Sequence, residues 1–153
     1  LGLGTDTLEA IDFRPATGQL YGLALDDPGT SIFLYLIDPQ TGSTTQVGPG
    51  IVLASGGAAT AFGFDFNPTV DRIRVVTNAG DNLRLNPNDG TLVGGAQDGD
   101  INPAPAVVAA TAYTNSFSQP LGGMGLVTTQ YTLDATANPL SSQLPPNNGT
   151  QVL

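Results

Sequence analysis

The stretch Phe-Gly-Phe-Asp-Phe-Asn-Pro at residues 62–68 decides the fold, because part of it occurs twice in the chain. Its last five residues match Ile-Asp-Phe-Arg-Pro at 11–15, which lies 53 positions earlier. A second motif, Leu-Ile-Asp-Pro at 36–39, returns as Leu-Asn-Pro at 85–87 and Leu-Asp-Ala at 133–135, 48 positions apart each time. A period of about 50 residues built from short apolar runs is typical of repeated sheets.

The apolar residues around this stretch alternate with a period of two. Phe62, Phe64 and Phe66 fall on one face of an extended segment, and the alternation continues through residues 72–75. This pattern predicts β-strands, and Gly, Pro, Asn or Asp in nearly every gap predicts turns between them. No segment has a sustained helical period. The expected strands lie at about 8–13, 19–25, 32–38, 44–48, 61–67, 72–77, 82–86, 91–95, 106–114, 124–134 and 140–144.

The grouping of these strands predicts a single all-β domain with a β-propeller-like fold. We expect about three blade-like antiparallel sheets over residues 6–50, 60–97 and 104–148. A closed propeller has about four to eight blades, so three blades leave two open sides. Open edges pair readily with other chains. The chain is therefore expected either to be a piece of a larger propeller or to be completed by other copies. Its start at Leu1 predicts a processed form or an excised segment.

Composition excludes several classes of function. The 13 acidic residues outnumber 4 basic residues, all arginine, so the net charge is −9 and the surface repels nucleic acid and anionic membranes. No apolar stretch approaches the roughly 18 residues that span a bilayer, so we expect no membrane insertion. Without His, Cys or Lys, the chain cannot build Ser-His or Cys-His nucleophiles, imidazole or thiolate metal sites, or Schiff bases. We therefore expect a protein that is not an enzyme and has no cofactor.

Strand register places most of the arginines together. A four-residue loop at 68–71 sets Asp65 opposite Arg74, and a three-residue loop at 78–80, with Gly80 in the left-handed region, sets Arg74 opposite Arg84. Arg72 lies diagonal to this ladder. Such a cluster binds carboxylate, sulfate or phosphate groups, which makes an anion or acidic sugar the expected ligand. The alternative is a structural ion network in which Asp71 or another acid supplies the second negative charge.

Two further sets of acidic residues are candidate sites. Asp12 and Asp65 occupy equivalent repeat positions, which suits either a carboxylate pair in a hydrolase or repeated hydrogen-bond acceptors for turn amides. The segment with Asp98, Asp100 and Asn102 begins like a calcium loop, with oxygen ligands at alternate positions. It then departs from the pattern, since Pro103 stands where that loop requires Gly. Calcium is the one metal that the sequence suggests.

Several motifs resemble an uncharacterised bacterial family, a domain of unknown function. They are Phe-Gly-Phe-Asp-Phe-Asn-Pro-Thr-Val-Asp-Arg-Ile-Arg-Val-Val at 62–76, Asn-Leu-Arg-Leu-Asn-Pro at 82–87, Val-Val-Ala-Ala at 107–110, Ala-Tyr-Thr-Asn at 112–115 and Pro-Pro-Asn-Asn-Gly-Thr at 145–150. The resemblance implies a propeller-like β fold in a secreted or surface-anchored protein. It implies no catalytic residues.

Together these observations predict a non-enzymatic, extracellular structural or adhesive module. We expect it to self-associate through open blade edges, with filaments or closed rings as products. The alternative is a binding module for an anionic glycan or small acid at the arginine cluster. A composition rich in Gly, Ala, Thr, Ser, Asn and Gln, with only 11% charged residues, is also typical of exported bacterial surface proteins.

Overall fold

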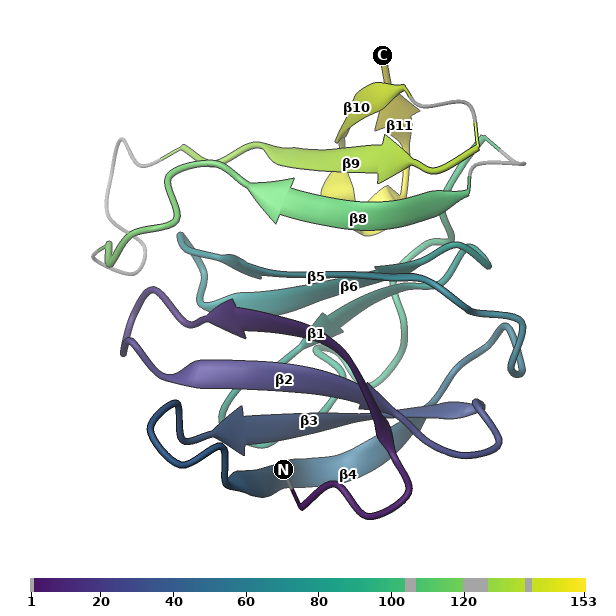
Figure 1. The fold of residues 1–153 in the computed structure, drawn as a ribbon. Coiled ribbons are helices and arrows are strands. Elements are labelled where there is room, and N and C mark those ends of the chain that lie inside the picture. The colour runs from purple at the N-terminus through teal and green to yellow at the C-terminus, as the bar shows by residue number, and fades with distance from the viewer. Residues whose placement is uncertain (1, 104–106, 120–126, 137–138) are drawn as a thin grey trace.

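The computed structural model describes residues 2–103, 107–119, 127–136 and 139–153. These residues form an all-β structure of three antiparallel sheets, with no α-helix among them (Figure 1). The first sheet holds β1 (Thr7–Phe13), β2 (Leu20–Leu25), β3 (Ser31–Ile37) and β4 (Thr44–Val52). The second holds β5 (Phe62–Asn67), β6 (Arg72–Thr77) and β7 (Asn82–Leu85). The third holds β8 (Val108–Tyr113), β9 (Gln130–Asp134), β10 (Leu140–Gln143) and β11 (Gln151–Val152).

The sheets lie one above another, with the second between the first and the third (Figure 1). Within each sheet, strands that follow one another in sequence are neighbours. The first strands of the three sheets lie next to one another in order: β5, of the second sheet, contacts β1 of the first sheet and β8 of the third. A short 3₁₀ helix, η1 (Pro146–Asn148), precedes β11.

The strand order confirms the all-β prediction and corrects it in two places. Residues 91–95 do not form a strand, because only a single bridge joins Leu92 to Leu85. Positive φ angles of 84° at Gly94 and 78° at Gly95 turn the chain away from the sheet. The third sheet gains β11 at 151–152, which the sequence analysis did not predict. The expected strand at 124–134 is realised as β9, and its residues 124–126 lie outside the described part of the chain.

Apolar packing joins the first and second sheets. Phe66, Ile73 and Val75 are fully buried, as the predicted face assignment requires. The ring of Phe66 packs edge-on against Tyr21 at 5.4 Å between centroids, and against Phe64 at 6.2 Å. From the first sheet, β3 contributes Ile32 and Leu34 to the same cluster. The repeated aromatic motif thus forms the centre of the main core.

Polar side chains lie between the second and third sheets. Those fully or almost fully buried there include Arg74, Asn82, Gln130, Thr132 and Gln143. Gly63 allows β8 to lie close to β5, because a side chain at Gly63 would meet backbone atoms of Thr111 and Ala110 at 2.6–2.7 Å. No helix among the described residues is long and apolar enough to cross a membrane.

Candidate arginine site

The register of the second sheet brings three of the four arginines together. Asp65 pairs with Arg74 across β5 and β6, and Arg74 pairs with Arg84 across β6 and β7, which confirms the predicted ladder. Gly80 has the predicted positive φ, at 98°, in the turn between β6 and β7. Arg72 lies two residues before Arg74 on the same face of β6.

Arg74 is the fixed centre of this cluster, with only 2% of its side chain exposed. Its Nη1 donates to Asn82 Oδ1 at 2.7 Å and to Asp98 Oδ2 at 2.8 Å. Its Nη2 donates to Asn147 Oδ1, also at 2.8 Å. Because second-sheet, loop and η1 groups all accept from it, this guanidinium joins distant parts of the chain.

Asp98 serves two arginines at once. Besides accepting from Arg74, its carboxylate accepts from Arg84 Nε at 2.7 Å and from Arg84 Nη2 at 3.0 Å. The backbone N–H of Asp98 donates to the carbonyl of Asn82, which holds the loop against β7. Among the described residues, Asp98 is the one carboxylate in an ion pair with Arg72, Arg74 or Arg84.

The acids named from sequence do not supply this charge. Asp71 pairs with Arg14 instead: Arg14 Nε donates to Asp71 Oδ1 at 2.8 Å, and this hydrogen bond is the main cause of a raised pKa at Arg14. Asp65, although opposite Arg74, accepts from the backbone of Tyr113 at 2.5 Å. Its place opposite Arg74 is as predicted, but its carboxylate accepts from the backbone of β8 and forms no ion pair with an arginine among the described residues.

Arg72 adds a third positive charge near the pair. Its Nη1 donates to the backbone carbonyl of Asp71 at 2.8 Å and more weakly to that of Val70 at 3.4 Å. The exposed Asp89 lies close enough for the charge of Arg72 to help lower its pKa, although hydrogen bonds from Thr91 are the larger cause. Arg74 and Arg84 thus share one ion-paired carboxylate, and Arg72 lies beside them without an ion pair among the described residues.

A cavity of about 220 Å³ opens beside these arginines. Its walls come from the second sheet, from β8 and from η1. The side chain of Arg84 is 29% exposed, so its guanidinium can reach a bound group without breaking the core. The polar residues that line the cavity are Asn67, Arg72, Arg74, Arg84, Tyr113 and Asn147.

Sequence reasoning found the arginines but missed Asp98, Tyr113 and Asn147 as their neighbours. Tyr113 OH donates to Gln130 Oε1 at 2.9 Å and lies 3.4 Å from Arg74 Nε. Asn147 belongs to the Pro-Pro-Asn-Asn-Gly-Thr motif, whose turn residues signalled a loop and nothing about its position. Contacts between sheets depend on how the sheets stack, which alternation within a strand does not encode.

Asp12 and Asp65 form a second polar pair, at the edges of the sheets. Asp12 Oδ2 accepts from the backbone N–H of Phe66 at 3.0 Å, just as Asp65 accepts from Tyr113 one sheet further on. The acceptor role expected for these residues is present, but the donors are strand amides of the next sheet, not turn amides. Burial raises the pKa of Asp65 to about 7, and the charge of Asp12 and a hydrogen bond between the two carboxyl groups add to the rise.

The three residues suggested for calcium have other contacts. Asp98 pairs with the arginines, and Asp100 Oδ1 accepts from Gln97 Nε2 at 2.6 Å. Asn102 Nδ2 donates to the backbone carbonyls of Asp100 and Asn148. In the described part of the chain, no three Asp, Glu, His or Cys side chains are grouped to hold a metal ion. Calcium binding at this loop stays a prediction.

The chain belongs to the DUF4394 family, a domain of unknown function, whose model matches residues 1–153. The family match therefore covers the full length of the chain, which includes every motif that carried the resemblance. No curated protein and no solved structure matches it.

Proposed function

We propose that the protein binds a small anion, such as the carboxylate or sulfate group of an acidic sugar, in the arginine cavity. The observation that carries this proposal is the charge imbalance around the cavity: Arg72, Arg74 and Arg84 line it, while Asp98, the carboxylate paired with Arg74 and Arg84, is not among the lining residues. A guanidinium offers two parallel N–H donors that match a carboxylate or sulfate in bidentate fashion.

The three arginines suit different parts of this task. Arg74 is held by Asn82, Asp98 and Asn147, so it supplies fixed positive charge with no loss of side-chain freedom on binding. Arg84 and Arg72 are partly exposed and bound on one side, which leaves donors for a ligand. On a chain of net charge −9, such a concentration of positive charge is expected to serve a ligand.

The size and polarity of the cavity favour a small, polar ligand. Cavities for drug-sized molecules are about 300–1,000 Å³, so this one fits a single charged sugar ring or a small organic acid. Beside the arginines, Asn67, Asn147 and Tyr113 offer amide and hydroxyl groups that can recognise ligand hydroxyls. We propose binding without catalysis, in keeping with a chain that has no His, Cys or Lys.

We further propose that the three sheets are blades of a propeller-like fold in a secreted or surface protein. The first part is supported by the position of β5 between β1 and β8. Asp12 on β1 accepts a backbone hydrogen bond from β5, and Asp65 on β5 accepts one from β8. Supporting the second part, only 11% of the residues are charged and the chain is rich in Gly, Ala, Thr, Ser, Asn and Gln, as exported proteins are.

Isothermal titration calorimetry with glucuronate, galacturonate and sulfate tests the binding proposal, with glucose as the neutral control. We expect the acidic probes to bind and their affinity to fall as salt is added, because counter-ions screen the arginines. Arg84→Gln should abolish binding, whereas Arg14→Gln, which changes the same charge away from the cavity, should retain it if the variant remains folded. Equal binding by the wild type and Arg84→Gln, or no binding of any acidic probe, would refute the proposal.

A further inference from the structure

The third sheet has most of its apolar side chains on the side away from the rest of the molecule. Apart from Val108 and Tyr113, the residues facing the second sheet are polar: Thr111, Thr132 and Gln130 on two strands, then Ser141 and Gln143 on the next. On the other side lie Ser142 and six apolar residues, which are Ala110, Ala112, Tyr131, Leu133, Leu140 and Val152. These six residues are called the outer face of the third sheet.

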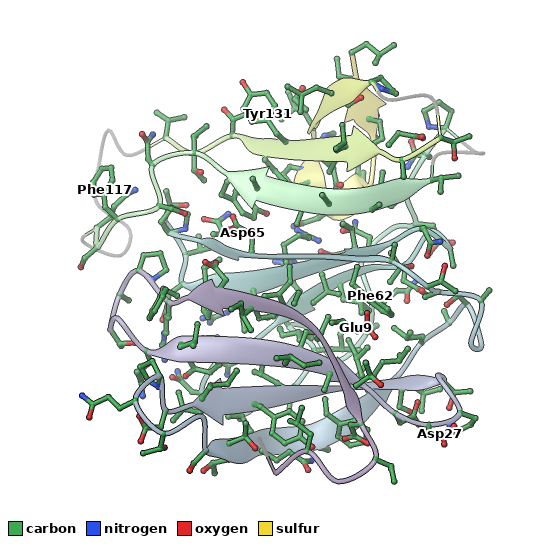
Figure 2. All side chains as sticks on the ribbon, viewed as in Figure 1. Glu9, Asp27, Phe62, Asp65, Phe117 and Tyr131 are labelled. Carbon is green, nitrogen blue, oxygen red and sulfur yellow. The ribbon has the colours of Figure 1, made fainter. Side chains whose placement is uncertain are left out.

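This outer face is exposed. The exposed fractions are 39% for Tyr131, 43% for Leu133, 64% for Leu140 and 44% for Val152. Figure 2 shows Tyr131 on the far side of the third sheet from Asp65, which lies between β8 and β5. An antiparallel sheet with one solvated side normally directs its polar residues to that side. Here most of the apolar residues lie on the solvated side, so this face is more apolar than a solvated face normally is.

The pairing of β8 with β9 fixes that orientation. Tyr113 lies opposite Gln130 in the ladder, and the Tyr113 hydroxyl donates to the Gln130 side chain in the buried layer. A shift by one residue would exchange the two faces and place Leu133 inside, but it would break this pair. The sequence of the third sheet thus specifies a mainly polar inner layer and a mainly apolar outer one.

The opposite end of the stack also presents apolar side chains. Ile11 and Phe13 on β1 are each 55% exposed, and their partners Gly22 and Leu20 place them on the side of the first sheet away from the core. Asp6 accepts from the Tyr35 hydroxyl on another part of that side, which leaves Ile11 and Phe13 uncovered. These two residues mark the outer face of the first sheet.

We propose that the outer face of the third sheet packs on the outer face of the first sheet of a second copy of the chain. A second copy is the expected partner because its first sheet would continue an arrangement already present within one chain, where β5 lies beside β1 and β8 lies beside β5. A β1 strand from the next copy, placed beside β8, extends the same series. Such head-to-tail contacts use two different surfaces, so they close into a ring or grow into a filament.

The chain's charge sets the conditions for this association. Each copy carries a net charge of −9, so copies repel one another at low ionic strength. The contact itself is apolar, with no charged residue among the eight that mark the two faces. Added salt should therefore strengthen self-association, whereas it should weaken anion binding in the arginine cavity. The two proposals are independent and respond to salt in opposite directions.

Light scattering coupled to gel filtration, over a series of protein and salt concentrations, tests the contact, with electron microscopy of the same samples. We expect the wild type to form rings or filaments, and Leu133→Glu and Ile11→Glu each to abolish them. Leu140→Glu, a more exposed change on the same face as Leu133, repeats the test should Leu133→Glu prove unfolded by circular dichroism. Gln40→Glu, which adds the same charge in the turn before β4, should assemble like the wild type.

Mixing the two variants identifies the pair of faces. A Leu133→Glu chain keeps a competent first sheet and an Ile11→Glu chain keeps a competent third sheet, so an equimolar mixture should form a dimer that neither forms alone. Assembly of Ile11→Glu at the wild-type level would show contact between two third sheets and overturn the head-to-tail proposal. A wild type that stays monomeric at all concentrations and salts would overturn self-association altogether.

Discussion

The two layers between the sheets are built from opposite chemistry. The layer between the first and second sheets consists of aromatic and branched apolar side chains around Phe66. The layer between the second and third is mainly amides, hydroxyls and arginines around Arg74, beside a small apolar cluster of Val76, Ile101 and Val108. Burial of apolar area is non-directional and stabilises by about 25 cal/mol per Å². A buried polar layer stabilises only when each donor finds its acceptor. The first layer therefore supports the fold, and the second specifies geometry and encloses the arginine cavity.

The largest expected effect is the loss of an aromatic ring from the apolar layer. Phe66→Ala should lower the free energy of unfolding by about 3–5 kcal/mol, because it leaves a cavity beside Tyr21 and Phe64. Urea denaturation measures the change. Phe117→Ala is the matched control, since Phe117 is 58% exposed and should contribute little (Figure 2). Similar losses in the two variants would contradict the assignment of the core.

A somewhat smaller loss is expected when the polar layer loses its central cation. Arg74→Leu should cost about 3 kcal/mol, since Asn147 loses its donor and Asp98 keeps only Arg84. Adding Asp98→Asn to that variant should recover part of the loss, because it removes a buried carboxylate that has lost one of its two partners. Denaturation of the two single variants and the double variant gives the interaction free energy between Arg74 and Asp98. If the changes in the free energy of unfolding were strictly additive, the two residues would be independent.

The carboxyl pair that joins the sheets should make stability depend on pH. The pKa of Asp65 rises from 3.8 to about 7 on folding, so the folded chain holds a proton that the unfolded chain releases. This contribution is present below about pH 4 and is lost as the pH rises to about 7. The melting temperature should therefore fall across that window. Asp65→Asn, which cannot titrate, should flatten the fall, and an unchanged pH profile in this variant would exclude the pair as its source.

The smallest effect on stability is expected at the edge of the polar layer. Arg84 is partly exposed and Asp98 retains Arg74, so Arg84→Gln should change the free energy of unfolding by less than about 1 kcal/mol. The same variant should lose anion binding. Unfolding of Arg84→Gln would instead show that the arginines form a structural network, the alternative that sequence analysis left open.

The contrast between the layers also explains what could be predicted from the sequence. Alternation around Phe64 and the lengths of two turns were enough to set Asp65 opposite Arg74 and Arg74 opposite Arg84, because register is a local property. The partners of those arginines were not predictable in the same way. Asp98 lies in a loop, where no strand period fixes its direction, and its resemblance to a calcium loop favoured another interpretation.

The orientation of the third sheet could not be predicted from the sequence either. Its alternation shows that Tyr131 and Leu133 share one face, but the default assumption directs apolar residues inward. Only the stacking of the sheets shows that Gln130 and Thr132 face the core and that the apolar set faces outward. Likewise, Gly94 and Gly95 end the pairing after Leu92, although an apolar run had predicted a strand there.

The most direct test of the arginine site is nuclear magnetic resonance of side-chain N–H groups during titration with galacturonate. If the cavity binds the acid, the Arg84 and Arg72 Nε–H and Asn147 Nδ2–H₂ resonances should shift with a common saturation curve. The Arg14 Nε–H resonance, which belongs to the Asp71 pair, should remain unchanged. Saturating shifts that spare Arg84 and Asn147, or no shift of any arginine, would contradict an anion site in this cavity.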